Sequence, residues 1–170
     1  MKEIIETVRL KLREFNIGDA INLFQLNLDQ EVIKFTGDLP FKNIEEAEKF
    51  IENYQEYKKH GFGRWAVEEK ESKKFIGWCG LKLNEENYID LGFRILKPEW
   101  KKGYATEAAK ACIEYGFENL KLNLIIARTS EQNYPSQKVL EKIGMAFWKR
   151  QYCEGLGQTL YYKIEKQMLK

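Results

Sequence analysis

The pattern of hydrophobic and polar residues along the chain predicts a fold that mixes strands and helices. Residues 8–12 alternate apolar and basic side chains, which is the period of a half-buried strand. Residues 19–28 carry apolar side chains at helical spacing. A second helix is predicted over residues 43–60, because Asn43 and Glu46 form the pattern of a capping box at its start.

Three strands are predicted next, over residues 62–69, 73–83 and 88–96, joined by short charged turns. Strands that follow one another so closely normally form an antiparallel meander. The middle strand contains FIGWCGLKL, which is apolar on both faces. We therefore expect it at the centre of the sheet, with helices on both sides.

The second half of the chain predicts a crossover. Small residues recur on one face of a helix predicted from Gly103 to about Leu120, and a buried strand follows over residues 123–129. A helix over residues 133–144 and two strands, residues 146–154 and 158–166, complete the pattern. A helix between two strands normally makes them parallel neighbours. The fold class is therefore α/β (α+β), with a mixed, mostly antiparallel sheet of six or seven strands, about four helices, and a splay between the fourth and fifth strands where a ligand can enter.

Length and composition indicate one domain over residues 1–170, because 44% hydrophobic and 14% aromatic content suffices for one core. The 28 basic and 26 acidic residues give a net charge of +2, which favours neither nucleic acid nor an anionic membrane as a partner. No run approaches the roughly 20 apolar residues that span a bilayer, and the charged N-terminal segment differs from a signal peptide. We expect a cytoplasmic protein.

The three cysteines, Cys79, Cys112 and Cys153, lie far apart and have no second ligand nearby at metal-binding spacing. We interpret them as reduced structural thiols, in keeping with a reducing compartment, and expect no metal site.

The stretch PEWKKGYATEAAK, residues 98–110, places a basic glycine turn at the head of a helix. Gly103 permits a backbone conformation that other residues resist, so the N–H groups of Lys101 to Ala105 can converge on an anion. A phosphate or pyrophosphate is the expected occupant. The alternative is an ordinary glycine turn flanked by solvated lysines, since neither G-x-x-x-x-G-K-[ST] nor G-x-G-x-x-G is present.

Four segments in order resemble one enzyme family: TVRLKLREF, FIGWCGL, IDLGFRILKPEWKKGYATEA and NYPSQKVLEKIGM. The chain is identified by them as a member of the GCN5-related N-acetyltransferase (GNAT) superfamily, and it most resembles the RimJ/RimL-like branch. Nearly the whole chain takes part. The resemblance implies a GNAT-like fold and acetyl-CoA as cosubstrate, with direct transfer of an acetyl group to a primary amine in a ternary complex.

The family's pyrophosphate signature is Arg or Gln, two residues, Gly, one residue, and Gly or Ala, and the chain matches it from Gly103 onward. Trp100 stands at the first position, where aromatic residues are common in this branch, and Lys101 stands where many members have a second glycine. The cofactor-binding residues that the resemblance implies are Phe93, Arg94, Ile95, Trp100, Lys101, Lys102, Gly103, Tyr104, Ala105, Thr106, Asn133 and Ser136. Among them, backbone groups of Phe93 and Ile95 would pair with the pantetheine amides like an added strand, and Asn133 would bond the same arm.

The resemblance also implies catalytic residues. An alkylamine has a pKa of about 10.4, so a base or a proton-carrying water is useful at neutral pH. Asp90 is the candidate carboxylate; the alternative is a solvent-facing residue that balances a Lys or Arg. Leu140 replaces the family's usual tyrosine acid, so Ser136 is expected to bond the leaving sulfur; its alternative role is to stabilise the first helical turn. A backbone N–H near Arg94 or Ile95 would hold the oxyanion.

The acceptor stays open between a protein N-terminus and a small-molecule amine, as does assembly as a homodimer. Trp65, Trp78 and Tyr54 either wall an acceptor pocket or belong to the core. The single histidine, His60, lies at a predicted helix end and is a poor candidate base. The alternative function is a CoA-binding sensor or interaction module that has lost turnover.

Overall fold

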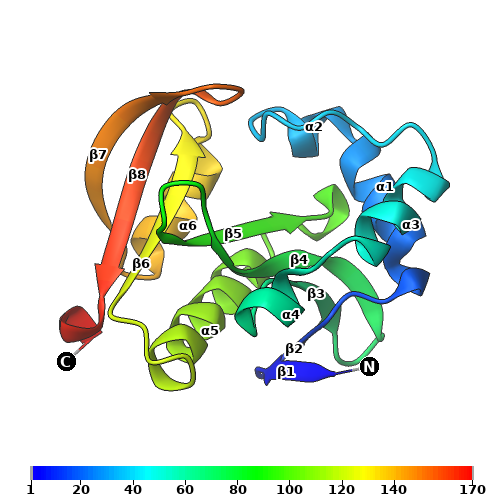
Figure 1. Cartoon of the computed structure of the whole chain (residues 1–170), viewed down its shortest axis with the longest axis horizontal. Coiled ribbons are helices and arrows are strands. Elements are labelled where there is room, and N and C mark those ends of the chain that lie inside the picture. The colour runs from blue at the N-terminus through cyan, green and yellow to red at the C-terminus, as the bar shows by residue number, and fades with distance from the viewer. Residues whose placement is uncertain (1, 170) are drawn as a thin grey trace.

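An eight-stranded mixed sheet, built by the part of the chain that the computed structural model describes, residues 2–169, organises the molecule (Figure 1). Side chains are described for residues 2–167. The strands are β1 (Glu3–Glu6), β2 (Leu10–Arg13), β3 (Arg64–Glu69), β4 (Lys74–Leu83), β5 (Ile89–Ile95), β6 (Leu124–Ser130), β7 (Ala146–Cys153) and β8 (Gly157–Glu165). Their order in the sheet is β1-β2-β3-β4-β5-β6-β8-β7, and β5 and β6 pair in parallel while the other neighbours pair antiparallel.

The helices occupy the connections of this sheet. The α-helices are α1 (Ala20–Leu28), α2 (Gln30–Ile33), α3 (Ile44–Glu52), α4 (Glu56–His60), α5 (Tyr104–Glu118) and α6 (Tyr134–Lys142). Short 3-10 turns are η1 (Ile17–Asp19), η2 (Lys97–Glu99) and η3 (Lys166–Leu169). Figure 1 shows α1, α2 and α3 grouped at one end of the molecule and β7 and β8 at the other.

The described residues form eight strands where six or seven were expected, because β1 forms an additional edge strand. Its sequence, Glu-Ile-Ile-Glu, is four residues long and lacks the alternation that marks a half-buried strand. Val8, expected in the first strand, lies in the turn between β1 and β2 and is 89% exposed. The register of β1 against β2 also shifts between Glu3 and Ile5.

The single helix expected over residues 43–60 is two helices. Asn53 ends α3 by donating two hydrogen bonds, from its N–H and its side-chain amide, to one carbonyl of the preceding turn. The break turns two tyrosines onto the start of β3: the Tyr54 hydroxyl accepts from the Arg64 N–H at 2.7 Å, and the Tyr57 hydroxyl donates to the Arg64 carbonyl. Because these contacts join separate elements, helical periodicity could not predict them.

The two faces of the sheet carry separate cores. Trp65 and Val67 of β3 point into a large core with α5 and α6, while Ala66 points into a smaller core with α1. The α5 helix lies close to the sheet, since a side chain at Gly116 would come within 2.8 Å of the Ile125 methyl group. The expectations that β4 is central and that small residues let this helix approach the sheet are confirmed.

The parallel pairing of β5 and β6 is very short. It comprises Asp90 opposite Ile126 and Leu91 opposite Ala127, after which the two strands diverge (Figure 1). β6 continues instead along β8. In the described chain, residues 92–95 of β5 therefore have no partner strand on their β6 side. The predicted mixed sheet and its splay between the fourth and fifth expected strands, now β5 and β6, are confirmed.

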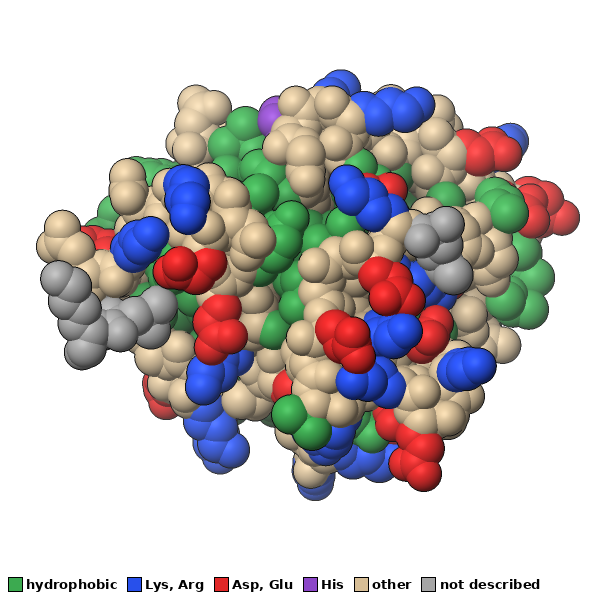
Figure 2. Space-filling model, turned by 90° about the horizontal axis from the view of Figure 1, so that it is seen from below, with side chains coloured by type: hydrophobic (Ala, Val, Ile, Leu, Met, Phe, Trp, Pro, Cys, Tyr) green, Lys and Arg blue, Asp and Glu red, His purple; other side chains and the backbone are tan. Residues whose placement is uncertain are grey.

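Charged side chains are dispersed over the surface. On the face drawn in Figure 2, lysine and arginine side chains alternate with aspartate and glutamate side chains around a band of hydrophobic ones. Among the described residues, no helix is long and apolar enough to cross a membrane, and no group of three or more His, Cys, Asp or Glu could hold a metal ion. The three cysteines are free thiols, with the Cys79 and Cys112 sulfurs 3.5 Å apart in the core.

Candidate functional site

The end of β5 presents unpaired backbone groups to the splay. The Leu96 N–H bonds the Ile76 carbonyl of β4 at 2.9 Å, and backbone groups of alternate residues in a strand face the same neighbour. Arg94 therefore faces β4, whereas Phe93 and Ile95 face the side that β6 has left. Of the two residues expected to hold an oxyanion, only Ile95 directs its N–H toward the splay.

Trp100 ties the following turn to this strand end. Its indole Nε1–H donates to the Ile95 carbonyl at 2.7 Å, and 40% of its surface remains exposed. This bond uses the last carbonyl on the β6 side of β5. The N–H and C=O of Phe93 and the N–H of Ile95 are left for a ligand.

The basic turn that precedes α5 holds two residues in the left-handed conformation. Lys101 has φ 63° and Gly103 has φ 82°, which explains why glycine suits both positions. The first helical bond of α5 runs from the Glu107 N–H to the Gly103 carbonyl. The N–H groups of residues 104–106 therefore have no helical partner and form the positive end of the helix dipole.

The two lysines of the turn, Lys101 and Lys102, differ in whether their charge is paired. Lys102 pairs with Glu99 at 2.8 Å, and Lys74 pairs with the other oxygen of the same carboxylate at 2.9 Å. These two ammonium groups lower the pKa of Glu99. Lys101 is exposed and has no ion-pair partner among the described residues. Its charge is therefore available to an anion at the head of α5.

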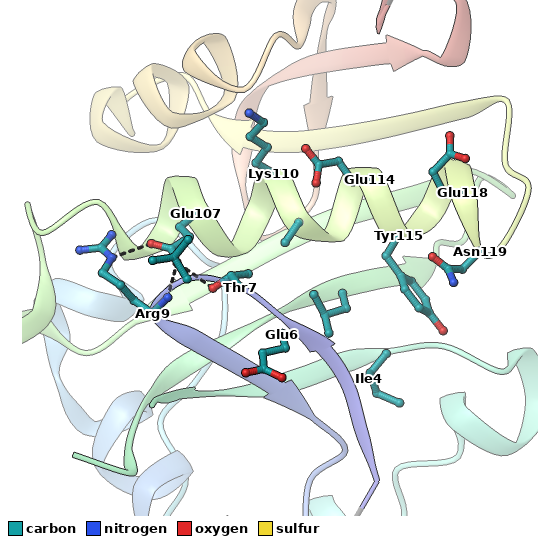
Figure 3. Close-up of a pocket in the computed structure, with 13 residues that line it drawn as sticks. Ile4, Glu6, Thr7, Arg9, Glu107, Lys110, Glu114, Tyr115, Glu118 and Asn119 are labelled. Atoms are coloured by element: carbon teal, nitrogen blue, oxygen red, sulfur yellow. Dashed lines mark hydrogen bonds and ion pairs between the residues drawn. The ribbon is translucent and has the colours of Figure 1, made fainter. Parts of the chain in front are cut away.

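A brace from the β1–β2 turn holds the same helix start. Arg9 Nη1 donates to the Lys102 carbonyl at 2.9 Å, while its Nε bonds Glu107 at 2.7 Å (Figure 3). The Thr7 hydroxyl donates to the other Glu107 oxygen at 2.7 Å. The Arg9 guanidinium also stacks 4.6 Å from the Tyr104 ring centre. Sequence analysis missed this brace, because its partners are about one hundred residues apart.

The groove shown in Figure 3 lies between β1 and α5 and has a volume of about 640 Å³. Its floor includes Ile4 and Tyr115, and its α5 rim carries Glu114 and Glu118. None of the predicted cofactor or catalytic residues lines it. The groove is therefore separate from the splay.

The start of α6 contributes two side chains that keep free polar atoms. Asn133 caps the helix by accepting the Ser136 N–H at 3.3 Å. Within the described part of the chain, the Asn133 amide nitrogen and the Ser136 hydroxyl have no hydrogen-bond partner. Because α5 follows β5, α6 follows β6 and these strands are parallel, both helix starts lie at the same edge of the sheet.

Asp90 lies in the paired part of β5, five residues before Ile95. It is buried, and its Oδ2 accepts from Arg128 Nε at 2.9 Å. Burial raises the pKa of Asp90 above its ordinary value, against the opposing effect of Arg64 and Arg128. The residue therefore has the arginine partner of the alternative interpretation but does not face solvent.

The predicted aromatic wall separates into two environments. Trp65 is 1% exposed in the large core, so it lines no pocket. Leu140, at the position of the family's usual tyrosine, is buried to the same extent in that core. Trp78 lies on the opposite face, with the Arg64 and Arg94 guanidinium groups 5.4 and 5.2 Å from its ring centre. Arg94 also bonds Asn27 and Asp38. Sequence analysis did not single out Arg64.

Comparison with known proteins identifies the class. Residues 9–146 match the Acetyltransferase (GNAT) domain family, and the chain belongs to it. It is 33% identical over 144 residues to the uncharacterized N-acetyltransferase p20 of Bacillus licheniformis, covering 83% of this chain and 81% of that protein. The solved GNAT-family acetyltransferase of Bacillus anthracis has a TM-score of 0.82 and 28% identity, with 96% and 98% of the two chains covered.

The fold is also that of spermidine N-acetyltransferase from Vibrio cholerae, solved in complex with CoA and spermine, with a TM-score of 0.80, 19% identity, and coverage of 96% and 100%. The chain is therefore an N-acetyltransferase with acetyl-CoA as cosubstrate, as the four sequence segments predict. Membership of the RimJ/RimL-like branch stays a prediction.

Substitution of Gly103 tests the turn as the pyrophosphate site. Gly103→Val should lower acetyl-CoA affinity at least tenfold, because a β-branched residue resists positive φ and would rotate the N–H groups at the head of α5. The matched control is Gly61→Val, at a glycine with φ 78° and no atom near the added Cβ.

Both variants should lose about 1–2 kcal/mol of folding free energy from backbone strain. Calorimetric titration and thermal melting of both separate binding from stability. A folded Gly103→Val protein that binds acetyl-CoA as tightly as the Gly61→Val control would contradict the assignment.

Proposed function

We propose that residues 1–170 form a single domain that transfers the acetyl group of acetyl-CoA to a primary amine directly, within a ternary complex. The observation that carries the proposal is the two-pair contact between β5 and β6 followed by their separation. This separation leaves backbone groups of Phe93 and Ile95 without a strand partner, next to a helix start with free N–H groups. A chain of amides that ends in a pyrophosphate has the matching chemistry.

In this proposal the cofactor lies along the splay. The pantetheine amides pair with Phe93 and Ile95 as an added strand would, and the Asn133 amide nitrogen donates to a pantetheine carbonyl. The pyrophosphate binds the N–H groups of residues 104–106, with Lys101 supplying a countercharge. The thioester then lies between the two strand ends, open to an amine.

The reaction requires one bond to form and one to break. The neutral amine attacks the thioester carbonyl carbon, and the β5 backbone N–H that the pantetheine amides leave unused stabilises the resulting oxyanion. Collapse of this intermediate breaks the carbon–sulfur bond, and the Ser136 hydroxyl donates a hydrogen bond to the departing thiolate. The amine proton passes to Asp90 through water, since the pKa of Asp90 is raised by burial.

The first test is product formation. Incubation with labelled acetyl-CoA and a panel of primary amines should release CoA thiol in step with N-acetylated product, measured by mass spectrometry. Peptides and small-molecule amines belong in the same panel, since the sequence leaves both acceptor classes open. Cofactor binding without transfer to any amine would contradict the proposal and support the CoA-binding sensor.

Ser136 provides a sharper test of the chemistry. Because Asn133 makes the α6 cap, Ser136→Ala should leave stability nearly unchanged. If the hydroxyl supports the thiolate, kcat and kcat/KM should fall together by roughly 10²- to 10⁴-fold while acetyl-CoA affinity stays the same.

Ser72→Ala, in the exposed β3–β4 turn, is the matched control and should keep its rate. Steady-state kinetics and thermal melting of the same preparation distinguish a catalytic role of Ser136 from a structural one. An Ser136→Ala enzyme with undiminished kcat would remove Ser136 from the catalytic group.

A further inference from the structure

Arg64 lies on the face of the sheet opposite α5, close to the splay. Side chains of β3 alternate between faces, and Arg64 shares its face with Ala66, which belongs to the core with α1. A Cβ at Gly92 would be 2.6 Å from Arg64 Nη2, so the guanidinium lies directly on the β5 backbone one residue before Phe93. In the proposed function the cofactor enters at the edge where α5 and α6 begin, which leaves the face that carries Arg64 as an approach for the amine.

The position of Arg64 is fixed by several contacts. Two tyrosine hydroxyls bond its backbone. Its Nη1 donates to the Gly80 carbonyl and, at 2.7 Å, to the Asp90 carbonyl. The Trp78 ring lies 5.4 Å away. The missing side chain of Gly92 leaves room for this guanidinium against the β5 backbone, so the guanidinium is preorganised.

The charge of Arg64 has no carboxylate at ion-pair distance, and its electrostatic partner is the Asp90 carboxylate, whose pKa it lowers from further away. Among the described residues no Asp or Glu oxygen lies within 4.0 Å of it, and its Nη2 and Nε have no hydrogen-bond acceptor. Arg64 is only partly buried, and neither of these two nitrogens is fully buried. Three N–H donors of a fixed guanidinium therefore have no acceptor and are not sealed from solvent.

Three acidic groups beside this site, Glu85, Glu86 and Asp90, already have basic partners. Arg128 pairs with Asp90 at 2.9 Å and with Glu85, and Lys149 lies 3.6 Å from Glu86. An acceptor with several ammonium groups would have to displace these partners. A carboxylate on the incoming amine would instead accept hydrogen bonds from the free N–H groups of Arg64.

We propose that Arg64 binds a carboxylate on the acceptor, so that the substrates of this enzyme are amines of the amino-acid class. The inference rests on the proposed function, since it needs the splay to be the site of transfer. A guanidinium fork binds a carboxylate through paired, charge-assisted hydrogen bonds and would orient the neighbouring amine toward the thioester. Arg64 thereby acts as a specificity determinant.

The experiment compares matched acceptors with the wild-type enzyme. A panel of L-amino acids is assayed against the amines that lack only the carboxylate, such as phenylalanine against 2-phenylethylamine and leucine against 3-methylbutylamine. Values of kcat/KM are expressed per neutral amine, which removes the difference in amine pKa. The best amino acid should exceed its decarboxylated partner by about 10- to 100-fold.

The Arg64→Gln variant should remove this preference. It should lower kcat/KM for the amino acid by about 10- to 100-fold, mainly through KM, and leave the decarboxylated amine within about twofold. Arg64→Lys, which keeps the charge and loses the fork, should recover part of the preference. Lys110→Gln, on the exposed side of α5, removes one positive charge elsewhere and should change neither substrate.

Each outcome has one meaning. Equal wild-type kcat/KM for paired acceptors, or transfer to peptide N-termini but not to amino acids, would overturn the role of Arg64 and leave the proposed function intact. An equal loss on both acceptors in Arg64→Gln would overturn it too, in favour of an effect on the chemical step, through the oxyanion or through the pKa of Asp90. Absence of transfer to every amine would overturn the proposed function itself. Should Arg64→Gln fail to fold, the wild-type comparison alone decides.

Discussion

The short parallel contact between β5 and β6 is the constraint on which the rest of the site depends. Two residue pairs join the halves of the sheet, and then β6 continues with β8 while β5 ends paired with β4 alone. Unpaired backbone groups are costly inside a protein unless water or a ligand satisfies them. The splay therefore creates a binding edge, and the parallel direction of the two strands brings the starts of α5 and α6 to that edge.

In the proposed mechanism the same constraint gives the two substrates different approaches to the splay. The turn before α5 offers N–H groups and the charge of Lys101. Arg9 holds this turn in place by bonding the Lys102 carbonyl and the Glu107 carboxylate of α5. The opposite face offers Arg64, held flat over Gly92. Acetyl-CoA, bound by its pyrophosphate at the turn, and a carboxylate-bearing amine, bound at Arg64, would come into contact only at the thioester. This arrangement fits direct transfer without a covalent enzyme intermediate.

The sequence predicted the features that depend on local pattern. The apolar run of β4, the small-residue face of α5 and the crossover between β5 and β6 follow from periodicity, and the structure confirms them. The Gly103 turn was also visible as a motif. The break after Asn53 and the position of Arg64 were not, because they arise from contacts between elements far apart in the chain. Asp90 was visible as a candidate, but only its placement beside Arg128 reveals its burial.

The most direct measurement is residue-resolved amide hydrogen exchange with and without acetyl-CoA. If the cofactor lies along the splay, saturating acetyl-CoA should slow exchange at the amides of Phe93 and Ile95 and at residues 104–106, with little change at Arg94, whose N–H faces β4. Unchanged exchange at Phe93 and Ile95, with protection confined to the groove between β1 and α5, would contradict the account.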